Sequence, residues 1–389
     1  LYEAFKRLKK SNLNKQQKHI VKDSLKGFEL SGVGLEGEHS DRFKAIQEQL
    51  SVLSNQFSKN VLQATNSWKK IVSIDDLKGY GEAEISKVKV GDEYVINLQI
   101  PVYIDLMTYA ENRELREEIY RAYISRASDI GITPKEFDNR NIMNEILELR
   151  LELSKLLGLS NYAEYSVQSK MVESPEEVIR FLENLVDLSL SQAKKELIDL
   201  EVYAGHTLMP WDLMFYSEKL KQKMFDFKKS DLKPFFPESC VLSGLFSTIQ
   251  RLYSVTLTEI EQECYHNDVR VIEIKDKRGS IGRIYLDVYA RENKRGGAWM
   301  SDFQGLYNDS LPVAFVVCNL NSPKGGKPAL FDFDEIVTLF HEFGHALHHL
   351  LTKVTFPCAA GISGVPWDGV ELPSQYMENF CYERDVIDL

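Results

Sequence analysis

The sequence contains no long uninterrupted apolar segment. No run approaches the roughly 20 apolar residues that a membrane-spanning helix needs, so we expect no membrane partner. The first ten residues are charged and amphipathic, and they lack the apolar core and cleavage site of a secretory signal. Nothing in this pattern indicates export, and we expect a cytoplasmic protein.

Cysteine is scarce, and no CxxC pair occurs. This spacing argues against a cysteine-ligated zinc site and against a disulfide framework. We therefore interpret the cysteines as free, buried thiols in a reducing compartment. There are five: Cys240, Cys264, Cys318, Cys358 and Cys381.

A concentrated basic segment is also missing. Asp and Glu number 58 against 47 Lys and Arg, which gives a net charge of −11 with the acidic residues spread along the chain. A nucleic-acid partner would require a basic face, so we expect none. There is no internal repeat or low-complexity tract, and a composition of 43% hydrophobic and 27% charged residues is typical of a globular protein.

The pattern that is present is mainly helical. Apolar residues recur at three- and four-residue spacing from Phe43 to Leu62 and predict a helix with one apolar face. Residues 70–93 interrupt the pattern, and residues 94–103 predict a short strand or an extended connection. Pro134 is predicted as the first residue of a helix. Further helices are predicted at residues 113–128, 139–157, 174–203, 242–253 and from 210 onward.

Strand-forming sequence is concentrated in one later region. Residues 269–275, 281–289 and 313–320 are short segments rich in Val, Ile and Tyr and separated by Gly and Asn. We predict that they form one small sheet, followed by a helix over residues 331–351. The predicted fold class is therefore mainly α, with a small β-sheet beside that helix.

The helix predicted at residues 331–351 has a well-defined start and a buried face. Asp332 is a good N-cap, and Glu335 three residues later completes a capping-box pattern. An apolar stripe at helical spacing indicates that this helix is buried. The stripe consists of Ile336, Phe340, Phe343, Leu347 and Leu350.

Two histidines in this helix form a metal-binding pattern. His341 and His345 are four residues apart, so both imidazoles lie on one face and can reach a single ion. Neutral imidazole suits zinc, at about 2.0–2.1 Å from nitrogen to metal. Glu342 lies about 100° round the helix from His341, beside the metal without binding it, where a general base belongs. Zinc lowers the pKa of a water molecule to roughly 7, and this carboxylate takes its proton during attack on a peptide carbonyl.

A catalytic zinc needs a third protein ligand. The metzincin pattern would place a histidine at position 351, which is Leu. His348 and His349 remain as alternatives, but a third ligand from the same helix would need a bent approach. Glu371 is the better candidate.

Glu371 stands just before Pro373, which is typical of a helix start. A second helix crossing the first would present Glu371 to the metal. Glu378, two turns further along that helix, is predicted to orient a ligand histidine rather than to bind the metal itself.

The two motifs together resemble a known family. HEFGH at residues 341–345, followed by VELPSQYMEN at residues 370–379, is similar to the thimet oligopeptidase (M3) family of zinc peptidases, and most similar to its bacterial oligopeptidase A group. The resemblance extends over nearly all of the chain. Other similar segments are residues 54–68, 144–158, 282–291, 294–299 and 313–320.

The resemblance implies a site and a fold. His341, His345 and Glu371 correspond to the ligands of one zinc ion per chain, and Glu342 corresponds to the catalytic base. The family fold is an elongated, two-lobed helical body with a deep channel that admits only short, unstructured peptides. The edge strand of its small sheet can pair with an extended substrate. We expect an N-terminal helical lobe at residues 1–130, an interleaved catalytic region at residues 131–389, and a monomer.

This chain departs from the family at its ends. The family continues beyond the second ligand helix with Tyr and His residues that stabilise the oxyanion, whereas this chain stops at Leu389, 18 residues after Glu371, and begins with Leu1 inside the family's N-terminal helices. We expect a chain truncated at both ends, with a fold incomplete at the C-terminus. Loss of one oxyanion donor costs about 10²–10³ in rate, so weak or no activity is expected. The leading function is hydrolysis of internal peptide bonds; the alternatives are an inactive zinc-binding fragment and a dipeptidyl carboxypeptidase of the same family.

Overall fold

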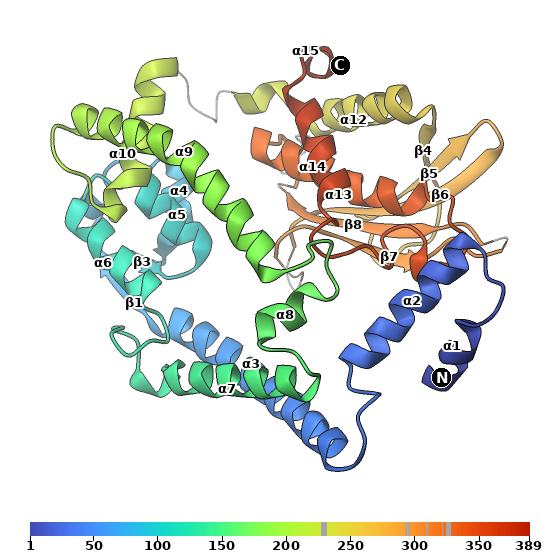
Figure 1. Cartoon of the computed structure of the whole chain (residues 1–389). Helices are drawn as coiled ribbons and strands as arrows, with labels where there is room; N and C mark the ends of the chain where they lie inside the picture. Colours follow the sequence, from blue (N-terminus) through green and yellow to red (C-terminus); the bar gives the residue numbers. More distant parts are fainter. Residues whose placement is uncertain (227–231, 292–293, 295, 309, 321, 324–327) are drawn as a thin grey trace. The chain divides into compact units, whose positions relative to one another are not determined.

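The computed structural model describes residues 1–389 except 227–231, 292–293, 295, 309, 321 and 324–327 (Figure 1). The chain forms two compact units. The first unit comprises Leu1–Arg7, Ser24–Gln168 and Val172–Asp226, and the second comprises Leu8–Asp23, Ser169–Met171 and Phe227–Leu389. The predicted domains, residues 1–130 and 131–389, stay a prediction, because compactness alone does not define independently folding domains. Position 295, inside the 294–299 segment of the resemblance, lies outside the described residues.

Long amphipathic helices dominate the first unit. The helix predicted from the spacing of Phe43 to Leu62 is confirmed as α3 (Gly37–Ser67), and its apolar face packs on α7 (Arg140–Leu156). Ser174 caps α9 (Pro175–Ala204) by accepting a hydrogen bond from the Glu177 N–H. The other helices are α4 (Glu82–Val88), α5 (Ile100–Tyr109), α6 (Arg113–Ile124), α8 (Tyr162–Val167) and α10 (Pro210–Phe225); α1 (Tyr2–Leu8) and α2 (Lys15–Leu30) contribute residues to both units.

The first unit differs from the sequence prediction in its connections. The strands β1 (Lys69–Val72), β2 (Lys89–Val90) and β3 (Glu93–Asn97) form an antiparallel sheet in the order β1-β3-β2. α5 begins inside the segment predicted to be extended, because Pro101 lies in its first turn, where a missing N–H breaks no hydrogen bond. Pro134 precedes only a 3₁₀ turn, and α7 begins at Arg140.

A buried ion pair joins α6 to α10 in the first unit. The side chains of Arg116 and Asp212 are 1% and 0% exposed, and Arg116 Nη2 donates to Asp212 Oδ1 at 2.9 Å. Other N–H groups of Arg116 donate to the carbonyls of Trp211 and Ala110. Arg113 forms a second ion pair with Asp212, at 2.7 Å. All the charge in this part of the core is therefore paired.

A five-stranded sheet forms the centre of the second unit, in the order β4-β5-β6-β8-β7. β6 and β8 are parallel, and the other neighbours are antiparallel. The three predicted strands are confirmed as β5, β6 and β8, whereas the two edge strands were not predicted. The strands are β4 (Thr256–Ile260), β5 (Arg270–Asp276), β6 (Gly279–Tyr289), β7 (Trp299–Gln304) and β8 (Val313–Leu320).

Helices cover one face of this sheet and complete its core. α13 (Phe333–Leu350) packs on β8 and β7, and its Phe343 is fully buried with side chains of β6 and β8. α12 (Glu238–Tyr253) belongs to the same core. Figure 1 shows α14 (Leu372–Glu378) crossing α13, with the short helix α15 (Arg384–Ile387) after it. The mainly α fold class, with a small sheet beside the helix that carries the two histidines, is confirmed.

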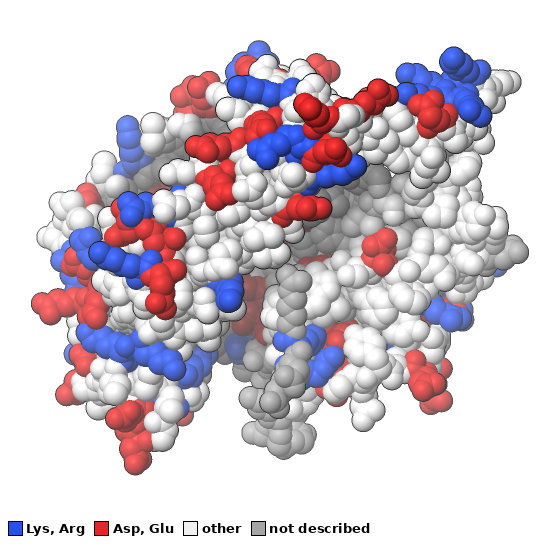
Figure 2. All heavy atoms as spheres, turned by 90° about the horizontal axis from the view of Figure 1, so that it is seen from below, with Lys and Arg blue, Asp and Glu red and all other residues white. Residues whose placement is uncertain are grey.

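The surface carries charges of both signs. On the face shown in Figure 2, acidic and basic side chains are interspersed. All five cysteines are free. The prediction of buried thiols is confirmed for Cys318 and Cys381, but Cys264 is half-buried and Cys240 and Cys358 are exposed. Among the described residues, no helix combines the length and the apolar character that crossing a membrane requires.

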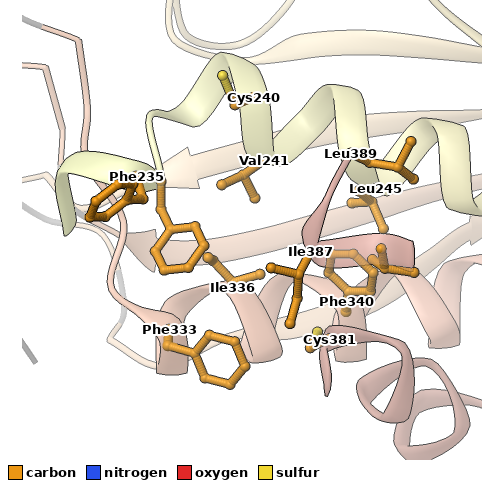
Figure 3. A pocket seen from close by; sticks show the side chains of 13 residues that line it. Phe235, Cys240, Val241, Leu245, Phe333, Ile336, Phe340, Cys381, Ile387 and Leu389 are labelled. Atoms are coloured by element: carbon orange, nitrogen blue, oxygen red, sulfur yellow. The ribbon is translucent and has the colours of Figure 1, made fainter. Parts of the chain in front are cut away.

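An apolar cavity of about 100 Å³ lies between α12, the start of α13 and the end of the chain (Figure 3). Leu245, Phe340 and Ile387 are among the residues that line it. The described residues of the lining contribute no Asp, Glu or His side chain. It therefore offers no side chain that would bind a metal through a carboxylate or an imidazole, and the candidate metal site lies elsewhere on α13.

Candidate metal centre

The start of α13 is fixed by its own sequence. Asp332 Oδ1 accepts a hydrogen bond from the Glu335 N–H at 2.9 Å, and Glu335 Oε2 accepts one from the Asp332 N–H at 2.9 Å. The predicted capping box is therefore confirmed. Because the helix start is fixed and the apolar stripe faces the sheet, the direction of His341 and His345 is fixed as well.

The structure brings three of the predicted residues together. The Nε2 atoms of His341 and His345 lie 3.2 and 3.0 Å from Oε2 of Glu371. The ligand-type atoms of the three side chains are all within 4.8 Å of one another. Glu371 comes from the residue immediately before α14, so the group is assembled where the two helices cross.

The donor set has the chemistry of a catalytic zinc site. Two imidazole nitrogens and one carboxylate oxygen converge, as in sites that keep one coordination position open. The Glu371 side chain is 50% exposed and that of His345 is 10% exposed, so the group is accessible from one side. Burial lowers the pKa of His345, which favours the neutral imidazole that binds metals. The residues present therefore fit zinc.

Glu378 holds the first histidine. Its Oε1 lies 2.6 Å from Nδ1 of His341. With Nδ1–H donating to this carboxylate, the lone pair of His341 Nε2 points towards Glu371. Carboxylate partners of this kind fix the ring orientation of metal-binding histidines and raise their basicity. The contact agrees with the role predicted for Glu378 from the sequence.

Glu342 lies beside the group in a dry environment. It is 5% exposed, and its Oε2 has no hydrogen-bond partner among the described residues. The backbone N–H of Met300, in the edge strand β7, hydrogen-bonds to the carboxylate. Burial raises the pKa of Glu342 to about 7, and Glu371 adds to the rise, while His341 and the Met300 N–H oppose it. A buried carboxyl with such a pKa is suited to proton transfer near neutral pH.

The two histidines further along α13 lie outside this group. His349 is fully buried, and its Nε2 lies 2.9 Å from the carbonyl oxygen of Gln304, at the end of β7. This contact links α13 to β7. His348 lines a cavity of about 470 Å³ with Tyr253 and Pro373. Among the described residues, only Glu371 joins His341 and His345 in a cluster of metal-binding side chains.

Sequence reasoning missed a glycine that makes this arrangement possible. A Cβ atom on Gly344 would lie 2.5 Å from the carbonyl oxygen of Pro373 and 2.5 Å from Cα of Ser374. Both are backbone atoms of α14, so only glycine allows the helices to cross this closely. Glycine inside an otherwise strong helix costs about 1 kcal/mol of helix stability relative to alanine. An unfavourable glycine between the two histidines was therefore the sequence feature that could have indicated a close helix contact.

Replacing Gly344 by alanine is expected to displace α14 and carry Glu371 away from the histidines. Forcing a methyl group into a packed contact costs about 1–3 kcal/mol. Zinc affinity is therefore expected to fall by about 10-fold or more, measured by competition with a chromophoric chelator. Gly27→Ala is the matched control, because Gly27 is also helical and a Cβ there meets nothing within 4 Å. Unchanged affinity in Gly344→Ala would show that the helix crossing does not set the ligand geometry.

Comparisons with known proteins give a consistent result. A model of Peptidase family M3 matches residues 106–389. Oligopeptidase A of Escherichia coli (strain K12) is 45% identical over 410 residues, covering 100% of this chain and 60% of the relative. Dipeptidyl carboxypeptidase of the same organism is 31% identical over 401 residues, covering 98% of this chain and 58% of the relative.

Among solved structures, an oligoendopeptidase F from Bacillus anthracis aligns with 16% identity and a TM-score of 0.48, covering 100% of this chain and 59% of the other. This chain thus spans about three fifths of the length of the proteins it matches.

Proposed function

This chain belongs to peptidase family M3, and on that basis we propose that it is a zinc metallopeptidase that hydrolyses internal bonds of short, unstructured peptides. We assign His341, His345 and Glu371 as ligands of one zinc ion and Glu342 as the general base. The observation that carries the proposal is the convergence of the three ligand-type side chains within 4.8 Å. The buried carboxylate of Glu342 next to them adds the base that hydrolysis requires.

The ligand types favour zinc over harder cations. Imidazole suits zinc, whereas magnesium and calcium prefer sets made of oxygen ligands only. When bound, zinc lowers the pKa of a water molecule to roughly 7 and polarises the carbonyl that is attacked. Glu378 keeps His341 in the orientation that binding needs, through the 2.6 Å contact with Nδ1.

Glu342 performs the proton transfers in this proposal. Its Oε2, which no described residue engages, accepts the proton of the attacking water and then donates it to the amine that leaves. A pKa of about 7 suits both steps, because the carboxyl is neither a very weak base nor a very weak acid near neutral pH.

The edge strand β7 supports an extended peptide as substrate. It ends the sheet, so its outer backbone groups face no neighbouring strand among the described residues. Met300 of β7 hydrogen-bonds to Glu342, so a peptide paired alongside this strand would run past the base. Such pairing requires free backbone groups, which short unstructured peptides have and folded proteins lack. The monomeric state and the cytoplasmic location stay predictions.

Two alternatives remain within the same site. A relative 31% identical to this chain is named a dipeptidyl carboxypeptidase, and such an enzyme needs a free C-terminal carboxylate on its substrate. A peptide amidated at its C-terminus separates the two, because only the endopeptidase cleaves it. The other alternative is a chain that binds zinc with little or no turnover.

Metal content tests the ligand assignment directly. We expect one zinc per chain by elemental analysis after dialysis, and a rise in Tm on adding zinc to the metal-free protein, because a ligand bound only by the folded state stabilises it. His345→Ala is expected to lose the bound zinc and the rise in Tm. His266→Ala, at a half-exposed histidine outside the cluster, is expected to keep both. Absence of bound zinc in the unmodified chain would overturn the proposal.

A further inference from the structure

The carboxylate of Glu371 faces a serine hydroxyl, whose single proton can go to Oε2 or to the backbone oxygen of the same residue. Ser374 Oγ lies 2.8 Å from Glu371 Oε2 and 2.9 Å from the backbone oxygen of Glu371. The same Oε2 atom is the one that lies 3.0 Å from His345 Nε2 and 3.2 Å from His341 Nε2. One oxygen of Glu371 therefore faces the serine hydroxyl and both histidines.

Without a partner, this carboxylate would be poorly placed. The Glu371 side chain is 50% exposed, and glutamate has several rotamers, most of which would carry its carboxylate into solvent. Ser374 is on the first turn of α14, three residues after Glu371, so its hydroxyl reaches back to the carboxylate. A carboxylate oxygen has two lone pairs. When the hydroxyl occupies one, the other remains directed at the two imidazoles.

Ser374 itself is held rigidly. It is 0% exposed, and its Cα is one of the two atoms that a Cβ on Gly344 would contact at 2.5 Å. Burying a hydroxyl is unfavourable unless it is hydrogen-bonded, and its two acceptors, Oε2 and the backbone oxygen, both belong to Glu371. An alanine would fill nearly the same space, so the role of the hydroxyl lies in what it does to Glu371.

We propose that Ser374 is a positioning residue that holds Oε2 of Glu371 towards His341 and His345, where the three side chains would hold the metal. The inference rests on the proposed function, because it takes Glu371 as a zinc ligand. It adds a member to the site that acts on the metal only through Glu371.

The test is zinc affinity in Ser374→Ala, measured by competition with a chromophoric chelator. Loss of an outer partner of a ligand typically weakens metal binding by about 10–100-fold, and we expect a loss in that range. The absorption spectrum of the cobalt-substituted protein is expected to change as well, because the coordinating oxygens change. Ser154→Ala is the matched control: Ser154 is also 0% exposed, and its hydroxyl donates to a backbone carbonyl in α7.

Two further variants separate positioning from packing. In a Glu371→Gln background, Ser374→Ala is expected to cause little additional loss, since the serine acts through that side chain. Ser374→Thr keeps the hydroxyl and is expected to bind zinc within a few-fold of the unmodified chain. Equal losses in Ser374→Thr and Ser374→Ala, or in Ser154→Ala and Ser374→Ala, would overturn the inference.

The outcomes also separate this inference from the proposed function. If the unmodified chain binds no zinc, the proposed function fails. If it binds zinc and Ser374→Ala binds equally well with an unchanged cobalt spectrum, only the role of Ser374 fails.

Discussion

Replacing Glu342 by glutamine is expected to lower the proposed rate of peptide hydrolysis by about 10²–10⁴-fold, the usual contribution of a general base, while zinc is expected to remain bound. Glutamine has nearly the same shape but cannot accept a proton at Oε2. Glu342 forms no hydrogen bond with the three proposed ligands among the described residues, and its side chain leaves α13 about 100° round the helix from that of His341. The metal content is therefore expected to be unchanged, and the loss is expected in kcat.

The measurement compares both proteins, zinc-loaded and at high concentration, on an internally quenched peptide amidated at its C-terminus. A sample without protein gives the background rate, and elemental analysis confirms equal zinc. Equal rates above background in the two proteins would remove the general-base role. Zinc-loaded protein that does not exceed the background, with or without Glu342, would favour the zinc-binding chain without turnover.

Replacing Asp212 by alanine destabilises the protein by about 3–5 kcal/mol, the cost of breaking a buried ion pair from one side. Burial opposes the ionisation of Asp212, but hydrogen bonds from Arg113, from the Met209 N–H and from Arg116 hold its pKa below the usual value. Without the carboxylate, the guanidinium of Arg116, 1% exposed, keeps its charge inside the core with only carbonyl partners.

Urea unfolding followed by circular dichroism measures this loss as a lower midpoint. Glu117→Ala is the control, because Glu117 forms an ion pair with Arg121 whose side chains are 37% and 63% exposed. Exposed pairs of this kind contribute at most about 1 kcal/mol. A midpoint in Asp212→Ala no lower than that of Glu117→Ala would show that the buried pair does not stabilise the first unit.

Features that depend on one segment of sequence were predictable. The start of α13 follows from Asp332 and Glu335, which are three residues apart, and its burial follows from the apolar stripe. The common face of His341 and His345 follows from their four-residue spacing. The helix after Glu371 was predicted from Pro373. Glu378 is seven positions after Glu371, about two helical turns, so both side chains lie on the same face of that helix, and Glu378 contacts His341.

Features that depend on two distant segments were not predictable in this way. Asp212 and Arg116 form a pair across 96 positions, and charged residues in a core have no periodicity that indicates burial. The edge strand β7, with sequence WMSDFQ, has little of the Val and Ile content that revealed β5, β6 and β8. Its contact with Glu342 through Met300 was therefore missed, and so was the proximity of Gly344 to α14.

The crossing of α13 and α14 makes the proposed metal a cross-link. His345 and Glu371 are 26 positions apart, and their ligand-type atoms lie close together at the two ends of the intervening segment. An ion held by both would close a loop in the chain, as a disulfide does, and would restrict the unfolded ensemble for as long as it stayed bound there. For a loop of this size the chain-entropy model gives about 3.5 kcal/mol. The ion would thus have two effects: it would take part in hydrolysis, and it would stabilise the packing of two helices of the second unit.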